Sequence, residues 1–118
     1  MTREELSHIL RSAAKIAKDN DILVVGSQSI LGSYSENELP AAVSISVEAD
    51  LVFPDPQDGA KKADEVDGTI GEHSLFHSTH HYYAQGVDLT TAKLPDGWET
   101  RIVLWHPDSA LPASAKCL

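Results

Sequence analysis

A chain of 118 residues with 42% hydrophobic content can bury one core and is too short for two, so we expect a single domain over residues 1–118. Nine basic against eighteen acidic side chains give a formal net charge of -9, which excludes a broad basic surface for nucleic acid or for an anionic membrane. Cys117 is the single cysteine, and the N-terminus has no signal-peptide pattern, so we expect a cytoplasmic protein without an internal disulfide.

The first predicted element is a helix. Thr2 and Glu5 have the spacing of a capping box, in which each side chain binds a free amide of the first helical turn. Apolar residues then recur at helical spacing, namely Leu6, Ile9, Leu10, Ala13, Ala14 and Ala17. This pattern predicts an amphipathic helix that ends near Asn20.

The run DILVVG comes next and predicts a strand. It is short and nearly continuously apolar, which is typical of a central strand covered on both faces. Gly26 and Ser27 follow, and such a pair lets a phosphate approach the backbone where a helix begins. The following QSILGSYSEN predicts that short helix. The alternative is an ordinary strand-to-helix turn in which Ser27 is the N-cap.

The segment AAVSISVEADLVF, residues 41–53, alternates between apolar and polar side chains and predicts a second strand. Glu48 and Asp50 lie one residue apart on its polar face, so their carboxylates point the same way. Such a pair can hold Mg²⁺ or Mn²⁺, which bind through one or two carboxylates plus substrate phosphates. The alternative is the solvated polar face of an edge strand, where charges deter pairing between sheets.

The second half of the chain predicts one helix and two strands. The turn PDPQDGA precedes a helix over 60–70, and a histidine-rich loop covers 71–83. Strands are expected at YYAQGVDL and WETRIVLW, joined by the turn KLPDGW, and HPDSALPASAKCL predicts a tail or the start of a segment cut short. The element order indicates an α/β (α+β) fold with a small mixed β-sheet and helices packed on it.

Four histidines in the predicted loop form a second candidate site, and they are His73, His77, His80 and His81. Two or three imidazoles at this spacing could bind a cation such as zinc, although the spacing fits no strict structural zinc pattern. The loop could instead fold over the phosphate pocket, where a histidine, Tyr82 or Tyr83 would contact a nucleotide. Ordinary loop packing is the remaining alternative.

The order "VVGSQSIL" then "VEADLVF" resembles the nucleotidyltransferase superfamily typified by DNA polymerase beta, in which a strand ends in Gly-Ser and an acidic-x-acidic strand follows. The strings "GSQSILGSY", "EADL", "IGEHSLFHSTHHYYAQGV" and "TAKLPDGW" are similar to an uncharacterised bacterial nucleotidyltransferase-like branch. Some relatives in that branch act in toxin–antitoxin modules. The resemblance covers residues 21–104.

The resemblance implies a site and a reaction. Gly26 and Ser27 would hold the triphosphate of a nucleoside triphosphate, and Glu48 and Asp50 would bind Mg²⁺ or Mn²⁺. Asp88 in "GVDL" is the candidate for a third carboxylate, as a metal ligand or base. The implied activity transfers a nucleotidyl group to a hydroxyl acceptor whose identity the sequence leaves open. The alternative is a catalytically inactive binding module, antitoxin-like or a partner in a protein complex.

Overall fold

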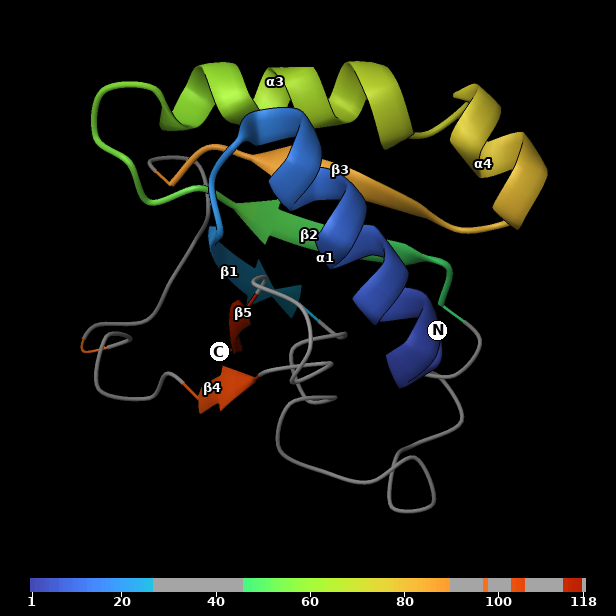
Figure 1. The fold of residues 1–118 in the computed structure, drawn as a ribbon, viewed down its shortest axis with the longest axis horizontal. Coiled ribbons are helices and arrows are strands. Elements are labelled where there is room, and N and C mark those ends of the chain that lie inside the picture. Colours follow the sequence, from blue (N-terminus) through green and yellow to red (C-terminus); the bar gives the residue numbers. More distant parts are fainter. Residues whose placement is uncertain (27–45, 90–96, 98–102, 106–113, 118) are drawn as a thin grey trace.

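The computed structural model describes residues 1–26, 46–89, 97, 103–105 and 114–117 (Figure 1). Its strands form one five-stranded sheet of order β3-β2-β1-β5-β4. The bounds are β1 Asp21–Val25, β2 Glu48–Val52, β3 Tyr83–Val87, β4 Val103–Trp105 and β5 Ser114–Cys117. The β1–β2 and β4–β5 pairs are antiparallel, whereas β1–β5 and β2–β3 are parallel. The predicted mixed sheet and the central place of the first strand are confirmed.

The first helix, α1, covers Arg3–Ala17 and begins with the predicted capping box. The Glu5 amide donates to Thr2 Oγ1 at 3.1 Å, and the Thr2 amide donates to Glu5 Oε1 at 2.8 Å. All six apolar residues of the predicted stripe are buried. The helix ends before Asn20 because Lys18 adopts a left-handed conformation with φ of 55°.

The sheet has two apolar faces. Figure 1 shows α1 crossing the sheet and α3, Gly59–Ile70, lying along β3. The larger core forms between these helices and one face of the sheet, with strand residues Ile22, Val24, Ala49, Leu51, Phe53 and Ala84. A smaller cluster on the opposite face contains Leu23, Val25 and Val52. The apolar β1 is therefore buried on both faces, as its sequence predicted.

The edge strand β3 is fixed closely to α3. A Cβ on Gly86 would lie 2.2 Å from the Ala63 carbonyl oxygen, so only glycine permits this approach. The Gly86 amide also donates to Asp67 Oδ1 at 2.6 Å. The helix predicted over 60–70 is thus confirmed, and it holds the outer edge of the sheet as well as covering one face.

Two expectations are wrong. Part of the predicted histidine-rich loop is a short helix, α4, Leu75–His80, capped by Ser74, whose side chain accepts from the His77 amide at 3.1 Å. The loop was expected because α4 has no buried residues and so no apolar stripe. The end of the chain, expected as a tail, forms β5 at Ser114–Cys117, because it pairs with β1 far away in sequence.

The strand expected over 41–53 is confirmed at Glu48–Val52. Val47, expected on the apolar face, precedes the strand and is 44% exposed. Residues 41–45, the helix expected after Gly26, most of the KLPDGW turn and residues 98–102 of the last predicted strand lie outside the described residues. Within the described ranges, none of the helices has the length and apolar character needed to cross a membrane.

Candidate functional site

Glu48 and Asp50 lie side by side on the sheet face opposite to the one that α1 and α3 cover. Ala49 and Leu51 point into the helix-covered core, whereas Val52 belongs to the opposite cluster. Since side chains alternate along a strand, Glu48 and Asp50 share the face of Val52. Both are partly buried. The predicted same-face arrangement of the two carboxylates follows from this register.

The two carboxylates are close enough to affect each other's charge. Burial, a hydrogen bond with the neighbouring Glu48 carboxylate and charge repulsion from it together raise the pKa of Asp50 to about 7. Asp50 Oδ1 is buried and has no hydrogen-bond partner. A buried, unpaired carboxylate oxygen is costly unless a proton or a cation compensates it. A proton on Asp50 or a bound cation would each supply this compensation.

Gly26 lies directly against this pair. Val25, the last residue of β1, is the cross-strand partner of Asp50, so Gly26 follows directly beside the Asp50 carboxylate. Gly26 has φ of 75°, and a Cβ there would lie 2.8 Å from Asp50 Oδ2. The structure thus brings together Gly26 and the acidic pair, as the sequence predicted. Ser27 lies outside the described residues.

Asp88 lies away from the pair. Strands β2 and β3 run in parallel with Val52 opposite Val87, so Asp88 follows the end of β3. Three residues of strand separate Asp88 from the level of Asp50, which is about 10 Å. Asp88 instead lines a pocket of about 350 Å³ with Phe53 and the loop that leads into α3. The structure therefore does not bring the expected third carboxylate to the pair, because the parallel register sets it beyond the strand.

The cross-strand partner of Asp50 is Gln85, and that of Glu48 is Tyr83. The Tyr83 hydroxyl donates to Glu48 Oε2 at 2.9 Å. Burial, the hydrogen bond to Glu48 and the negative charges of Glu48, Glu72 and Asp50 together raise the pKa of Tyr83 to about 12. The phenol thus keeps its proton and remains a donor to Glu48 at neutral pH.

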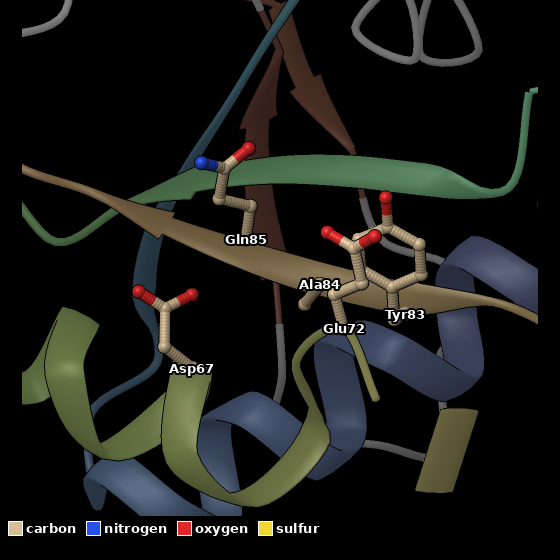
Figure 2. A pocket seen from close by; sticks show the side chains of 5 residues that line it. All are labelled: Asp67, Glu72, Tyr83, Ala84 and Gln85. Atoms are coloured by element: carbon tan, nitrogen blue, oxygen red, sulfur yellow. The ribbon is translucent and has the colours of Figure 1, made fainter. Parts of the chain in front are cut away.

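A pocket of about 250 Å³ lies at the outer edge of β3 and shares Tyr83 with the acidic pair. Figure 2 shows its lining side chains, Asp67, Glu72, Tyr83, Ala84 and Gln85. The Glu72 carboxylate lies beside the Tyr83 ring, whereas Asp67 comes from α3 and accepts the Gly86 amide. Tyr83 therefore contacts the acidic pair through its hydroxyl and also lines this pocket.

The four histidines do not converge on one point. The His80 ring lies 4.6 Å from that of His8 on α1, and the His77 ring lies 4.5 Å from that of Tyr83. The His73 amide donates to His77 Nδ1 at 3.0 Å, and His81 is exposed. Within the described part of the chain, no three His, Cys, Asp or Glu side chains are grouped to hold a metal ion. His77 and His80 therefore pack against aromatic rings of different elements.

Sequence reasoning missed the partners of the acidic pair. Tyr83 was considered for nucleotide contact, and neither its bond to Glu48 nor the places of Glu72 and Gln85 were expected. The alternation of Tyr83 and Gln85 in YYAQGV signals one shared face, but the register against β2 is a tertiary property.

Comparison of the chain with protein-family models, with curated proteins and with solved structures found no match.

Proposed function

We propose that this chain is a nucleotidyltransferase-like domain that moves a nucleotidyl group from a nucleoside triphosphate to a hydroxyl acceptor, using Mg²⁺ or Mn²⁺. The observation that carries the proposal is the unpaired, buried Asp50 Oδ1 beside Glu48, with Gly26 adjoining it. Carboxylate oxygens are the ligands that these hard cations prefer. The donor set of the pair therefore suits the cation.

In this proposal each described residue has a defined role. Glu48 and Asp50 hold the cation, and Gly26 lets the triphosphate approach the backbone closely. When bound, the cation would neutralise charge on the phosphates during an in-line displacement. In that displacement the acceptor oxygen bonds to the α-phosphorus as the bond to pyrophosphate breaks, and the hydroxyl proton passes to solvent. The triphosphate role of Ser27 is part of the same proposal.

The second candidate is a binding module that lacks catalysis, and the position of Gln85 favours it. Gln85 is an amide, and it stands where a third carboxylate beside Asp50 would lie in the β2–β3 register. An amide contributes no charge to a two-metal site and cannot act as a base. A domain of this kind could still bind a cation or a protein partner, in an antitoxin-like role or within a complex.

The proposal is tested by titrating Mn²⁺ into the ¹⁵N-labelled chain with ATP present and following the broadening of each amide signal. Paramagnetic broadening should centre on Gly26, Glu48 and Asp50, because the ion would sit between these residues. Pyrophosphate release in the same samples, with RNA, protein and small-molecule hydroxyl acceptors offered in turn, distinguishes the transferase from the binding module.

Two variants make the test specific. Asp50→Asn keeps the shape of the side chain but removes its charge, and should abolish the broadening. Asp64→Asn is the matched control, since Asp64 is exposed on α3 and its loss should change nothing. Broadening confined to the histidine-bearing α4, or identical in Asp50→Asn, would refute the metal site. Binding without pyrophosphate release would favour the second candidate.

A further inference from the structure

Tyr83 is held in place by contacts from three parts of the fold. Its amide donates to the Val47 carbonyl at 2.9 Å, which fixes the start of β3 against β2. The ring of His77, on α4, lies 4.5 Å from the Tyr83 ring at an interplanar angle of 48°. The hydroxyl donates to Glu48 Oε2 at 2.9 Å. A donor supported in this way limits the rotamers available to the Glu48 side chain.

The hydrogen bond engages one of the two Glu48 oxygens. A carboxylate whose Oε2 accepts from a fixed phenol has one lone pair of that oxygen engaged, so a cation would be held chiefly through Oε1. Mg²⁺ needs near-octahedral geometry with short bonds and accepts such single-oxygen ligands. Ca²⁺ prefers more ligands at longer distances and often takes both oxygens of a carboxylate. The arrangement therefore favours the smaller ion.

We propose that Tyr83 is a positioning residue that keeps Glu48 a single-oxygen ligand and so gives the acidic pair its preference for Mg²⁺ or Mn²⁺ over Ca²⁺. This inference rests on the proposed function, because it requires a cation at Glu48 and Asp50. It goes further by assigning the ion selectivity of the site to one hydroxyl group on the neighbouring strand.

The adjacent tyrosine supplies a matched control. Tyr82 lies one residue earlier, belongs to the core on the helix-covered side of the sheet, and its hydroxyl is paired with His8 Nδ1 at 2.5 Å. Tyr82→Phe and Tyr83→Phe each remove one hydroxyl from neighbouring positions. Only the second change removes a contact to the acidic pair.

The experiment measures Mn²⁺ binding by electron paramagnetic resonance, with Ca²⁺ and Mg²⁺ as competitors, in wild type, Tyr83→Phe, Tyr82→Phe and Asp50→Asn. Tyr83→Phe should weaken Mn²⁺ binding by about tenfold, as for other outer partners of metal ligands. It should also lower the ratio of Mn²⁺ to Ca²⁺ affinity, which a merely structural defect would leave unchanged. Tyr82→Phe should alter neither quantity.

The outcomes separate this inference from the proposed function. If Mn²⁺ binding depends on Asp50 but Tyr83→Phe retains both the affinity and the ratio, the role of Tyr83 is refuted and the metal site stands. If wild type shows no Asp50-dependent Mn²⁺ binding, both fail. Should Tyr83→Phe not fold, His77→Ala, which removes the ring packed against Tyr83, should shift the ratio the same way by a smaller factor. An unchanged ratio there would also overturn the inference.

Discussion

The fold shifts the ionisation of Asp50 strongly towards the protonated form. Burial and the Glu48 carboxylate both disfavour its charged form and raise its pKa to about 7. In the unfolded chain the value returns to 3.8, so the unfolded state loses its proton first as the pH rises. The folded state therefore binds more protons in this range, and the free energy of unfolding falls as the pH rises from 3.8 to about 7. Asp50 therefore costs the metal-free fold stability at neutral and higher pH.

We predict that Asp50→Asn is more stable than wild type at about pH 8 in the presence of EDTA. The gain should be about 1–2 kcal/mol, because solvent screening reduces the full effect of the pKa shift at a partly exposed group. The difference should vanish below about pH 3, where Asp50 is protonated in both states of the wild type. Urea unfolding followed by circular dichroism measures both values.

Added Mg²⁺ provides the control for this prediction. A cation bound to the folded state raises the unfolding free energy of wild type by mass action, and it should leave Asp50→Asn unchanged. A variant that is less stable than wild type at about pH 8 would show that Asp50 makes a favourable native contact instead. The pair would then be a structural feature of the fold.

At the scale of elements, α4 is attached to α1 through an aromatic cluster. The His8 ring on α1 lies 5.0 Å from Phe76 and 4.6 Å from His80, and His8 Nδ1 pairs with the Tyr82 hydroxyl. Burial lowers the pKa of His8, and the nearby His80 and Arg11 lower it further. Glu4 and Glu5 also face this cluster. Burial raises the pKa of the Tyr82 hydroxyl, and the negative charges of Glu5 and Glu4 raise it as well. The cluster therefore favours neutral His8.

We predict that acidification loosens this contact. Since the His8 pKa is lower in the folded state than in the unfolded state, its contribution to stability is present above about pH 6.5 and is lost as the pH falls toward the folded value. His8→Gln keeps a side chain that can bond to Tyr82 but does not titrate. Between about pH 7.5 and pH 5 it should lose less stability than wild type, by at most about 1 kcal/mol because solvent screens the group.

Thermal unfolding across this pH range measures the effect, and amide hydrogen exchange in α4 localises it. His73→Gln is the matched control, because His73 is exposed and lies outside the cluster. Parallel pH profiles for wild type and His8→Gln would contradict the role assigned to His8.

For the whole molecule, the return of the chain to β1 completes the sheet. Strand β5 lies between β1 and β4, and Lys116 is the cross-strand partner of Leu23 on one side and Leu104 on the other. Without β5, β1 would be an open edge with its apolar residues next to unpaired backbone groups. The stability of the central strand therefore depends on residues almost a hundred positions later.

We predict that Lys116→Pro destabilises the domain, because proline removes an amide from a strand that is paired on both sides and fits poorly there. The loss should be about 3 kcal/mol, which is typical of proline within regular structure. Lys116→Thr, with its amide retained, should differ little from wild type. Urea unfolding and hydrogen exchange of the β1 amides measure the effect, and equal stability of the two variants would mean that β5 does not support β1.

The sequence predicted those features that depend on local pattern. The capping box of Thr2 and Glu5 and the apolar stripe behind it define α1, and the apolar run at Ile22 is typical of a central strand. Alternation placed Glu48 and Asp50 on one face. Strand β5 escaped prediction because its four residues are too few for their alternation to stand out. Helix α4 escaped because none of its residues is fully buried. The resemblance implied that Gly26 and the acidic pair share one site, and the β1–β2 register is what places Gly26 beside Asp50.

By itself the sequence determined the composition of the acidic pair and the elements that carry it, because these properties depend on neighbours along the chain. Tertiary structure decided which strand lies next to β2 and in which register. That register pairs Tyr83 with Glu48, so that the Tyr83 hydroxyl donates to the Glu48 carboxylate. It also places Gln85 beside Asp50 and leaves Asp88 beyond the end of β3. The physical reason is that strand pairing joins residues through backbone hydrogen bonds across long sequence distances, and a shift of one residue would exchange the faces of every side chain.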